Sequence, residues 1–257
     1  MSLAIQLNLR PKFCELLQSV PEEYQKSLEG ISNNDRVPTM GYCLWSAARS
    51  GAVCSYLLGR GQECIDWGTK TADAAIYYLL GDWHETTINE ETGQNGRKGW
   101  FGRFPASNWT MYLDDGLCWG AVAGRWERID RMLTFPESWV AEDYEGKALR
   151  GYYLGLARWW NDPTDLDWID DVKQLRGAGS KGVHLLCDAV MAISNRDAEA
   201  TAAALKMYVQ WFLKRRDHEE QFPVQATFLW HVAQRKGFAL ELAEEVQIYL
   251  FRLPDEG

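Results

Sequence analysis

The sequence predicts an all-α fold, an irregular array of antiparallel helical hairpins packed as one globular or solenoid-like domain over residues 1–257. Apolar residues recur every three or four positions along most of the chain, which is the period of a helix buried on one face. Short turns at residues able to take a positive φ separate these segments, at Gly81, Gly124, Asn195-Arg196 and Gly237. No two alternating segments are joined by the two-residue turn of a β-hairpin.

The N-terminal third is expected to hold a helical hairpin. Residues 11–30 predict one or two short helices broken at Val20-Pro21, because proline disfavours helix in the residue before it. An apolar helix is predicted from Pro38 to Gly59, and Gly59-Arg60-Gly61 ends it. The segment from Gln62 to Leu80 then predicts its antiparallel partner.

A glycine-rich loop at about 86–104 interrupts the helical pattern. Loops of this length are either mobile linkers or functional segments. This one places Arg97, Lys98 and Arg103 beside Trp100 and Phe101, so a contact arm is the alternative to a linker.

The remaining chain predicts four further helix pairs. The first helix of the first pair begins at a cap at Ser107 or Asn108 and ends at Gly124. Turn spacings of 43 residues (Gly81 to Gly124) and 42 residues (Asn195 to Gly237) are close to the period of two-helix solenoid units, so a bundle and a superhelix both stay open. The other predicted segments are Trp126–Leu133, Asp143–Trp160 with Leu166–Leu175, Val183–Ile193 with Ala198–Lys214, and Val224–Arg235 with the segment ending at Leu253.

Composition and charge exclude several classes of function. The six cysteines form no C-x-x-C pair, which predicts free buried thiols and a cytoplasmic location. No N-terminal signal is visible, and no apolar run approaches the ~20 residues of a membrane span. The net charge of −9 argues against nucleic acid, because Lys and Arg supply that affinity.

Acidic residues are concentrated between Glu137 and Asp171, where nine carboxylates stand against three cations, a local balance of −6. Such a zone can steer a basic protein partner toward the surface. Solvated helix faces acquire the same charges for solubility alone, so both interpretations stay open.

Candidate catalytic and metal-ligating residues are few. His184 and Asp188 lie one helical turn apart, but they lack further ligands, so we expect a hydrogen-bonded pair and no metal site. No nucleophile elbow, Cys–His signature or phosphate-binding loop predicts a catalytic residue or a cofactor. Paired carboxylates for glycoside hydrolysis are an alternative to solvated caps and loop residues, with tryptophans for sugar stacking: Asp114, Asp115, Asp162, Asp165, Asp167, Asp170, Asp171, Trp119, Trp159, Trp160 and Trp168.

Several short motifs follow one another between residues 110 and 254. They are Asp114-Asp-Gly-Leu-Cys-Trp-Gly-Ala-Val-Ala-Gly-Arg-Trp-Glu-Arg-Ile-Asp-Arg-Met-Leu-Thr-Phe-Pro136, Gly151-Tyr-Tyr-Leu-Gly-Leu-Ala-Arg-Trp-Trp160, His184-Leu-Leu-Cys-Asp-Ala-Val-Met-Ala-Ile-Ser-Asn-Arg-Asp197, Gly237-Phe-Ala-Leu-Glu-Leu242 and Tyr249-Leu-Phe-Arg-Leu-Pro254. The series resembles the immunity-49 family of bacterial polymorphic-toxin immunity proteins. These are all-α chains with an Arg-Asp turn and a C-terminal Gly-hydrophobic-x-hydrophobic-Glu and Tyr-Leu-Pro pattern.

The resemblance implies a stoichiometric inhibitor that binds and blocks a cognate toxin domain without catalysis. An acidic inhibitor would attract a basic toxin by charge complementarity. A helical-repeat interaction scaffold is the first alternative and a carboxylate-dependent hydrolase the second. The candidate partner-binding residues are Trp139, Glu142, Asp143, Glu145, Asp162, Asp165, Asp167, Trp168, Asp170 and Asp171.

Overall fold

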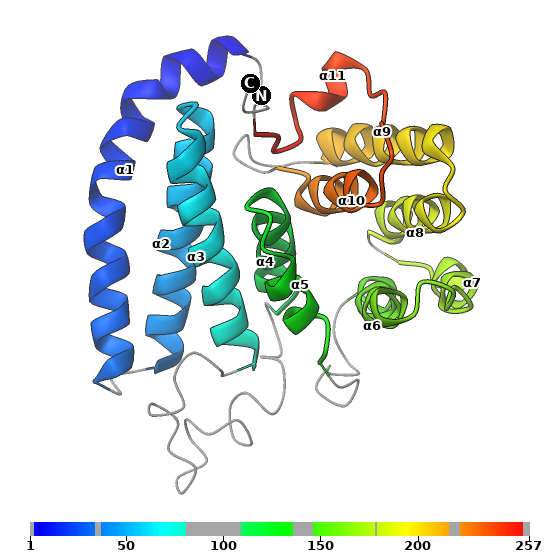
Figure 1. The fold of residues 1–257 in the computed structure, drawn as a ribbon, viewed down its shortest axis with the longest axis horizontal. Coiled ribbons are helices and arrows are strands. Elements are labelled where there is room, and N and C mark those ends of the chain that lie inside the picture. Colours follow the sequence, from blue (N-terminus) through cyan, green and yellow to red (C-terminus); the bar gives the residue numbers. More distant parts are fainter. Residues whose placement is uncertain are drawn as a thin grey trace, which may run out of the picture. The chain divides into compact units, whose positions relative to one another are not determined.

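The computed structural model describes residues 3–33, 37–80, 109–135, 146–177, 179–215 and 222–253, which form eleven helices and no strand (Figure 1). The all-α prediction is therefore confirmed. The chain divides into two compact units, one made of Met1–Met132 with Leu253–Gly257 and the other of Leu133–Arg252. The prediction that residues 1–257 form a single domain stays a prediction.

The described residues of the first unit form five helices, each of which packs on the next in sequence. Small residues let α2 and α3 approach closely: a Cβ added at Gly51 would lie 2.5 Å from Cδ2 of Trp67. The predicted hairpin of residues 38–59 and 62–80 is thus confirmed. The bounds are α1 Leu3–Ser32, α2 Val37–Leu57, α3 Gly61–Leu80, α4 Trp109–Val122 and α5 Trp126–Met132.

The first helix is continuous, and the predicted break at Val20-Pro21 is wrong. Proline inside a helix removes one hydrogen bond and crowds an earlier carbonyl, at a cost of about 3 kcal/mol. Here α1 packs along α2 and buries Leu17, Val20 and Tyr24. Each such large side chain contributes about 1.5–3 kcal/mol when buried, which offsets the proline penalty. The helix is bent in Figure 1, as internal prolines lead one to expect.

In the second unit, the residues that the structure describes form six helices. The pair α8–α9 forms the predicted helical hairpin, α6 packs on α7 and α8, and α10 packs on both α8 and α9. Trp159 is buried at the centre, where its Nε1 donates a 2.7 Å hydrogen bond to Oγ of Ser194. The bounds are α6 Lys147–Asn161, α7 Trp168–Gln174, α8 Ser180–Ser194, α9 Ala198–Arg215, α10 Val224–Arg235 and α11 Glu244–Gln247.

Left-handed residues end helices where the sequence predicts them, with one shift of position. At the α8–α9 turn it is Arg196, with φ of 57°, that takes this conformation, whereas Asn195 has φ of −78°. The next amide, of Asp197, then donates to the carbonyl of Ala192 at 2.9 Å and closes the end of α8. The glycines confirmed in this role are Gly59, Gly124 and Gly237.

The expected helical partner of α10 is largely absent, since only the four residues of α11 are helical between Gly237 and Leu253. Bonds to α10 replace helical ones in this segment. The ring Nε2 of His231 lies 2.9 Å from the carbonyl oxygen of Phe251, and the amide of Phe251 donates to Oγ1 of Thr227 at 3.3 Å. The C-terminal segment is therefore held by tertiary bonds that periodicity does not show.

Several predicted features lie outside the described residues, namely Gly81, the loop at 86–104, the caps at Ser107 and Asn108, and the start of the Asp143–Trp160 helix. None of the described helices has both the length and the apolar character needed to cross a membrane.

Candidate functional site

The short helix α7, which carries two of the nine carboxylates of the acidic zone, packs on α6 at two glycines one turn apart. A Cβ added at Gly155 would lie 2.0 Å from Cδ2 of Trp168, and one at Gly151 would lie 2.8 Å from Cγ2 of Val172. Only a residue without a side chain lets the indole approach this closely. Trp168 is 4% exposed and Val172 is also buried, so these two residues anchor α7 from within.

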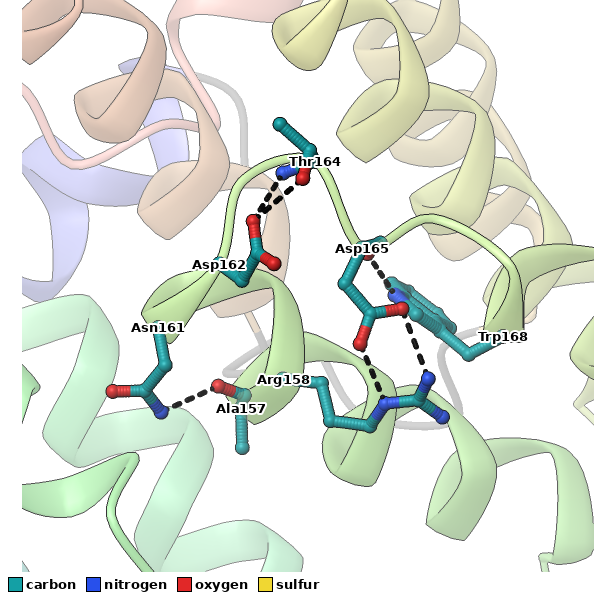
Figure 2. A network of polar contacts seen from close by, with 7 residues as sticks. All are labelled: Ala157, Arg158, Asn161, Asp162, Thr164, Asp165 and Trp168. Atoms are coloured by element: carbon teal, nitrogen blue, oxygen red, sulfur yellow. Dashed lines mark hydrogen bonds and ion pairs between the residues drawn. The ribbon is translucent and has the colours of Figure 1, made fainter.

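An ion pair fixes the connection between α6 and α7 (Figure 2). Nε and one terminal nitrogen of Arg158 donate to the two carboxylate oxygens of Asp165, at 2.8 and 2.9 Å. Nε1 of Trp168 donates to the carbonyl of Asp165 at 3.1 Å. Two-point Arg–carboxylate pairing adds geometric specificity to a surface pair of modest energy. The connection is thereby tied to α6 by Arg158 and to α7 by Trp168.

A second polar contact occupies Asp162 at the beginning of this connection. The amide and the hydroxyl of Thr164 both donate to Oδ1 of Asp162, at 3.0 and 2.7 Å (Figure 2). These bonds hold the pKa of the Asp162 carboxyl below its usual value. A carboxyl with a lowered pKa is poorly suited to act as a general acid. Asp162 therefore shapes the turn.

A cavity of about 370 Å³ lies beside the Arg158–Asp165 pair. Apolar side chains, among them Leu154 and Phe135, form part of its wall, and Asn161 adds an amide. Nδ2 of Asn161 donates to the carbonyl of Ala157 at 2.8 Å. The carboxylate of Asp165 in the cavity wall is paired with the guanidinium of Arg158, so the two charges neutralise each other there.

Three carboxylates of the zone are left exposed around the start of α7. Asp167 precedes the helix, and Asp170 and Asp171 lie in its first turn. None of the three forms an ion pair with any residue in the described ranges. Carboxylates at a helix N-terminus gain about 0.3–1 kcal/mol from the helix dipole. Their charge remains available to a cation outside the unit.

The ten predicted partner-binding residues thus have different outcomes. Trp139, Glu142, Asp143 and Glu145 lie outside the described residues. Asp162 is bonded to Thr164 and Asp165 to Arg158 within the turn between α6 and α7. Trp168 is buried and holds α7 against α6. The three that the structure brings together on the surface are Asp167, Asp170 and Asp171.

The predicted His184–Asp188 hydrogen bond is wrong. Lys173 of α7 forms an ion pair with Asp188, and the His184 ring Nε2 bonds to the carbonyl of Leu175 at 3.1 Å. Both side chains join α7 to α8, because α7 brings the Lys173 ammonium group within reach of Asp188 and the Leu175 carbonyl at its end within reach of His184. Within the described ranges, no group of three His, Cys, Asp or Glu side chains could hold a metal ion.

Asp115 is not the solvated residue that the sequence suggests. It is buried inside α4 and pairs with Nε of Arg49 from α2 at 2.9 Å. Loss of hydration raises the pKa of the Asp115 carboxyl, and Arg49 opposes that rise. The tryptophans proposed for sugar stacking are also engaged in packing, since Trp119 and Trp159 are buried and half-buried Trp160 lies 6.0 Å from the ring of Phe228.

All six cysteines are free, as predicted, and four of them are buried. Burial raises the pKa of the Cys64 and Cys187 thiols to about 12. A nucleophilic cysteine requires a lowered pKa instead. These two thiols are therefore core residues.

Sequence reasoning missed the two residues that position α7, Arg158 and Gly155. Gly155 stands between Leu154 and Leu156 in an otherwise good helix, and such a glycine signals a close approach by another element. Arg158 carried no signal, because its partner lies seven residues away across a turn.

Comparison with protein-family models, curated proteins and solved structures finds no match for this chain. The resemblance to the immunity-49 family therefore stays a prediction.

Proposed function

We propose that this chain is an immunity protein that binds a cognate bacterial toxin domain and blocks it without catalysis. Two independent features support the proposal. The motifs between residues 110 and 254 resemble the immunity-49 family in their order. The second unit also presents charge that its own described residues leave unpaired, which suits recognition of a basic protein surface.

The observation that carries the proposal is the cluster formed by Asp167, Asp170 and Asp171. All three are exposed at the N-terminal end of α7, the helix that Trp168 holds against α6. A rigid cluster of like charges raises the rate at which an oppositely charged partner associates, and salt weakens the effect. The proposed partner is accordingly a toxin domain with a basic surface.

Growth of a bacterial host tests the function directly. The product of the gene immediately upstream is expressed with and without this chain, and rescue of the poisoned host is the expected result. An upstream product that is harmless, or toxic but not relieved by this chain, would contradict the proposal.

Charge neutralisation tests the surface. The triple variant D167N/D170N/D171N should lower the association rate with the toxin about tenfold at low salt, and less at high salt. The matched control is E199Q/E244Q/E245Q, which removes the same charge from exposed residues in the first turns of α9 and α11. Equal rates for the two triple variants would remove the cluster from the interface.

An interaction scaffold is the second candidate, and one observation favours it. An apolar cavity of about 390 Å³ lies among α6, α8, α9 and α10. A scaffold would bind its partner through such a surface, and its binding would be insensitive to the Asp167 cluster. A carboxylate-dependent hydrolase has less support, because Asp162 and Asp165 are engaged with Thr164 and Arg158.

A further inference from the structure

Apolar and aromatic side chains form most of the wall of the cavity among α6, α8, α9 and α10. One face of α8 contributes Gly182, Val183 and Leu186, and α9 opposes it with aromatic rings. Gly182 permits this arrangement, since a Cβ there would lie 2.2 Å from the Trp211 ring. The cavity volume of about 390 Å³ is at the lower end of the range for small-molecule sites, which is about 300–1,000 Å³.

The aromatic wall follows a single stripe of α9. Tyr208, Trp211 and Phe212 lie three and four residues apart, and the Tyr208 ring centroid is 5.6 Å from that of Trp211 and 6.3 Å from that of Phe212. The Tyr208 hydroxyl donates to Oε1 of Gln225 at 2.8 Å, so the buried phenol is satisfied within the wall. Trp211 and Phe212 are half-buried and leave ring surface for a ligand.

A cation lies at the end of the same stripe. Cζ of Arg215 is 5.4 Å from the centroid of the Trp211 ring, and this side chain is exposed. Arg215 forms no ion pair with another residue of the described ranges. In a chain of net charge −9, a guanidinium that stacks on one ring of the cavity wall and has no ion pair within the described ranges favours a ligand that combines a ring with a negative charge.

We propose that this cavity binds a small aromatic carboxylate. Its ring enters the cavity beside the contact between Trp211 and Gly182 and lies against Leu149 and Phe212, and its carboxylate meets Arg215 at the rim. This site is separate from the Asp167 cluster and does not depend on the proposed immunity function.

Calorimetric titration of the full chain with 2-naphthoate and with its neutral analogue 2-naphthamide tests the proposal. Saturable one-to-one binding of naphthoate is expected. Arg215→Gln should weaken naphthoate about threefold or more and leave naphthamide unchanged. Leu149→Trp fills the cavity and should abolish both. The matched control is Lys206→Gln, an exposed cation of α9 that does not line the cavity.

The proposal is overturned if naphthoate fails to bind at about 1 mM, a level that corresponds to roughly 4 kcal/mol. Binding that survives Leu149→Trp, or that responds equally to Arg215→Gln and Lys206→Gln, would overturn it too. If Leu149→Trp does not fold, fluorine NMR of the native chain labelled with 5-fluorotryptophan tests the site instead. The Trp211 signal is assigned by its absence from the spectrum of Trp211→Phe. That signal must shift on titration, and an unshifted signal refutes the site.

Discussion

Replacing Gly155 with alanine should push the Trp168 indole of α7 away from α6. The added Cβ would lie 2.0 Å from Cδ2 and 2.1 Å from Cε3 of Trp168, whereas carbon atoms in contact settle at about 3.5–4.0 Å. The indole must therefore retreat by about 1.5 Å. It cannot do so freely, because its Nε1 is bonded to the carbonyl of Asp165 and its ring packs on Tyr152 at 6.2 Å.

The expected cost follows from three terms. Overpacking a core costs about 1–3 kcal/mol. Loss of the Trp168–Asp165 hydrogen bond adds about 0.5–1.5 kcal/mol. Alanine in a helix interior returns about 1 kcal/mol relative to glycine. The free energy of unfolding should therefore fall by about 0.5–3.5 kcal/mol, the sum of these estimates.

Urea unfolding followed by circular dichroism measures this change. Gly61→Ala is the control, since a Cβ at the start of α3 meets nothing within 4 Å and should be neutral or slightly stabilising. In a Trp168→Ala background, Gly155→Ala should become neutral or stabilising, which gives a coupling free energy of about 1.5 kcal/mol or more. A Gly155→Ala chain as stable as the original, with no coupling to Trp168, would refute the packing argument.

Three further predictions concern the two cores. Burial lowers the pKa of His231 to about 4, below the unfolded value of about 6.5, so the unfolded chain takes up the proton first. Up to about 3 kcal/mol of stability, present above pH 6.5, should be lost as the pH falls from 6.5 to 4, and His231→Gln should flatten that part of the urea-derived profile. Arg49→Met should cost about 2–4 kcal/mol at pH 7, because it leaves buried Asp115 without its cation, whereas Asp115→Asn should cost about 1 kcal/mol or less; equal thermal shifts would contradict this asymmetry. Iodoacetamide at pH 8 should leave Cys64 and Cys187 of the folded chain unmodified and react with the partly exposed Cys14 and Cys43, as mass spectrometry of the peptides will report.

The helices were predictable where one apolar face and a left-handed turn residue both appear in the sequence. The turns at Gly124 and Gly237 illustrate this, since their glycines take φ of 68° and 85°. Prediction failed where tertiary contacts override local preference. Pro21 continues a helix because α1 is buried along α2, and the segment before Leu253 is held by His231 and Thr227 instead of by its own helical bonds.

The candidate site was predictable only in its charge. A count of acidic residues locates the zone, but it cannot tell a carboxylate that a neighbour occupies from one that faces solvent. Asp165 lies within hydrogen-bond distance of Arg158 because the turn after α6 reverses the chain. Trp168 packs in the core because Gly155 has no side chain in its place. Both facts depend on the packing of α7 against α6, which the sequence shows only through Gly151 and Gly155.

The acidic residues near α7 therefore divide into two sets with different physical roles. Asp162 accepts a hydrogen bond from Thr164, and Asp165 pairs with Arg158. Both contacts hold the turn between α6 and α7, so changing these two carboxylates should displace α7. Asp167, Asp170 and Asp171 hold nothing among the described side chains, and their charge acts on whatever approaches. A variant that reverses the whole zone would mix a displaced helix with a lost charge. Only neutralisation of the second set, with the first left intact, isolates the electrostatic contribution to partner binding.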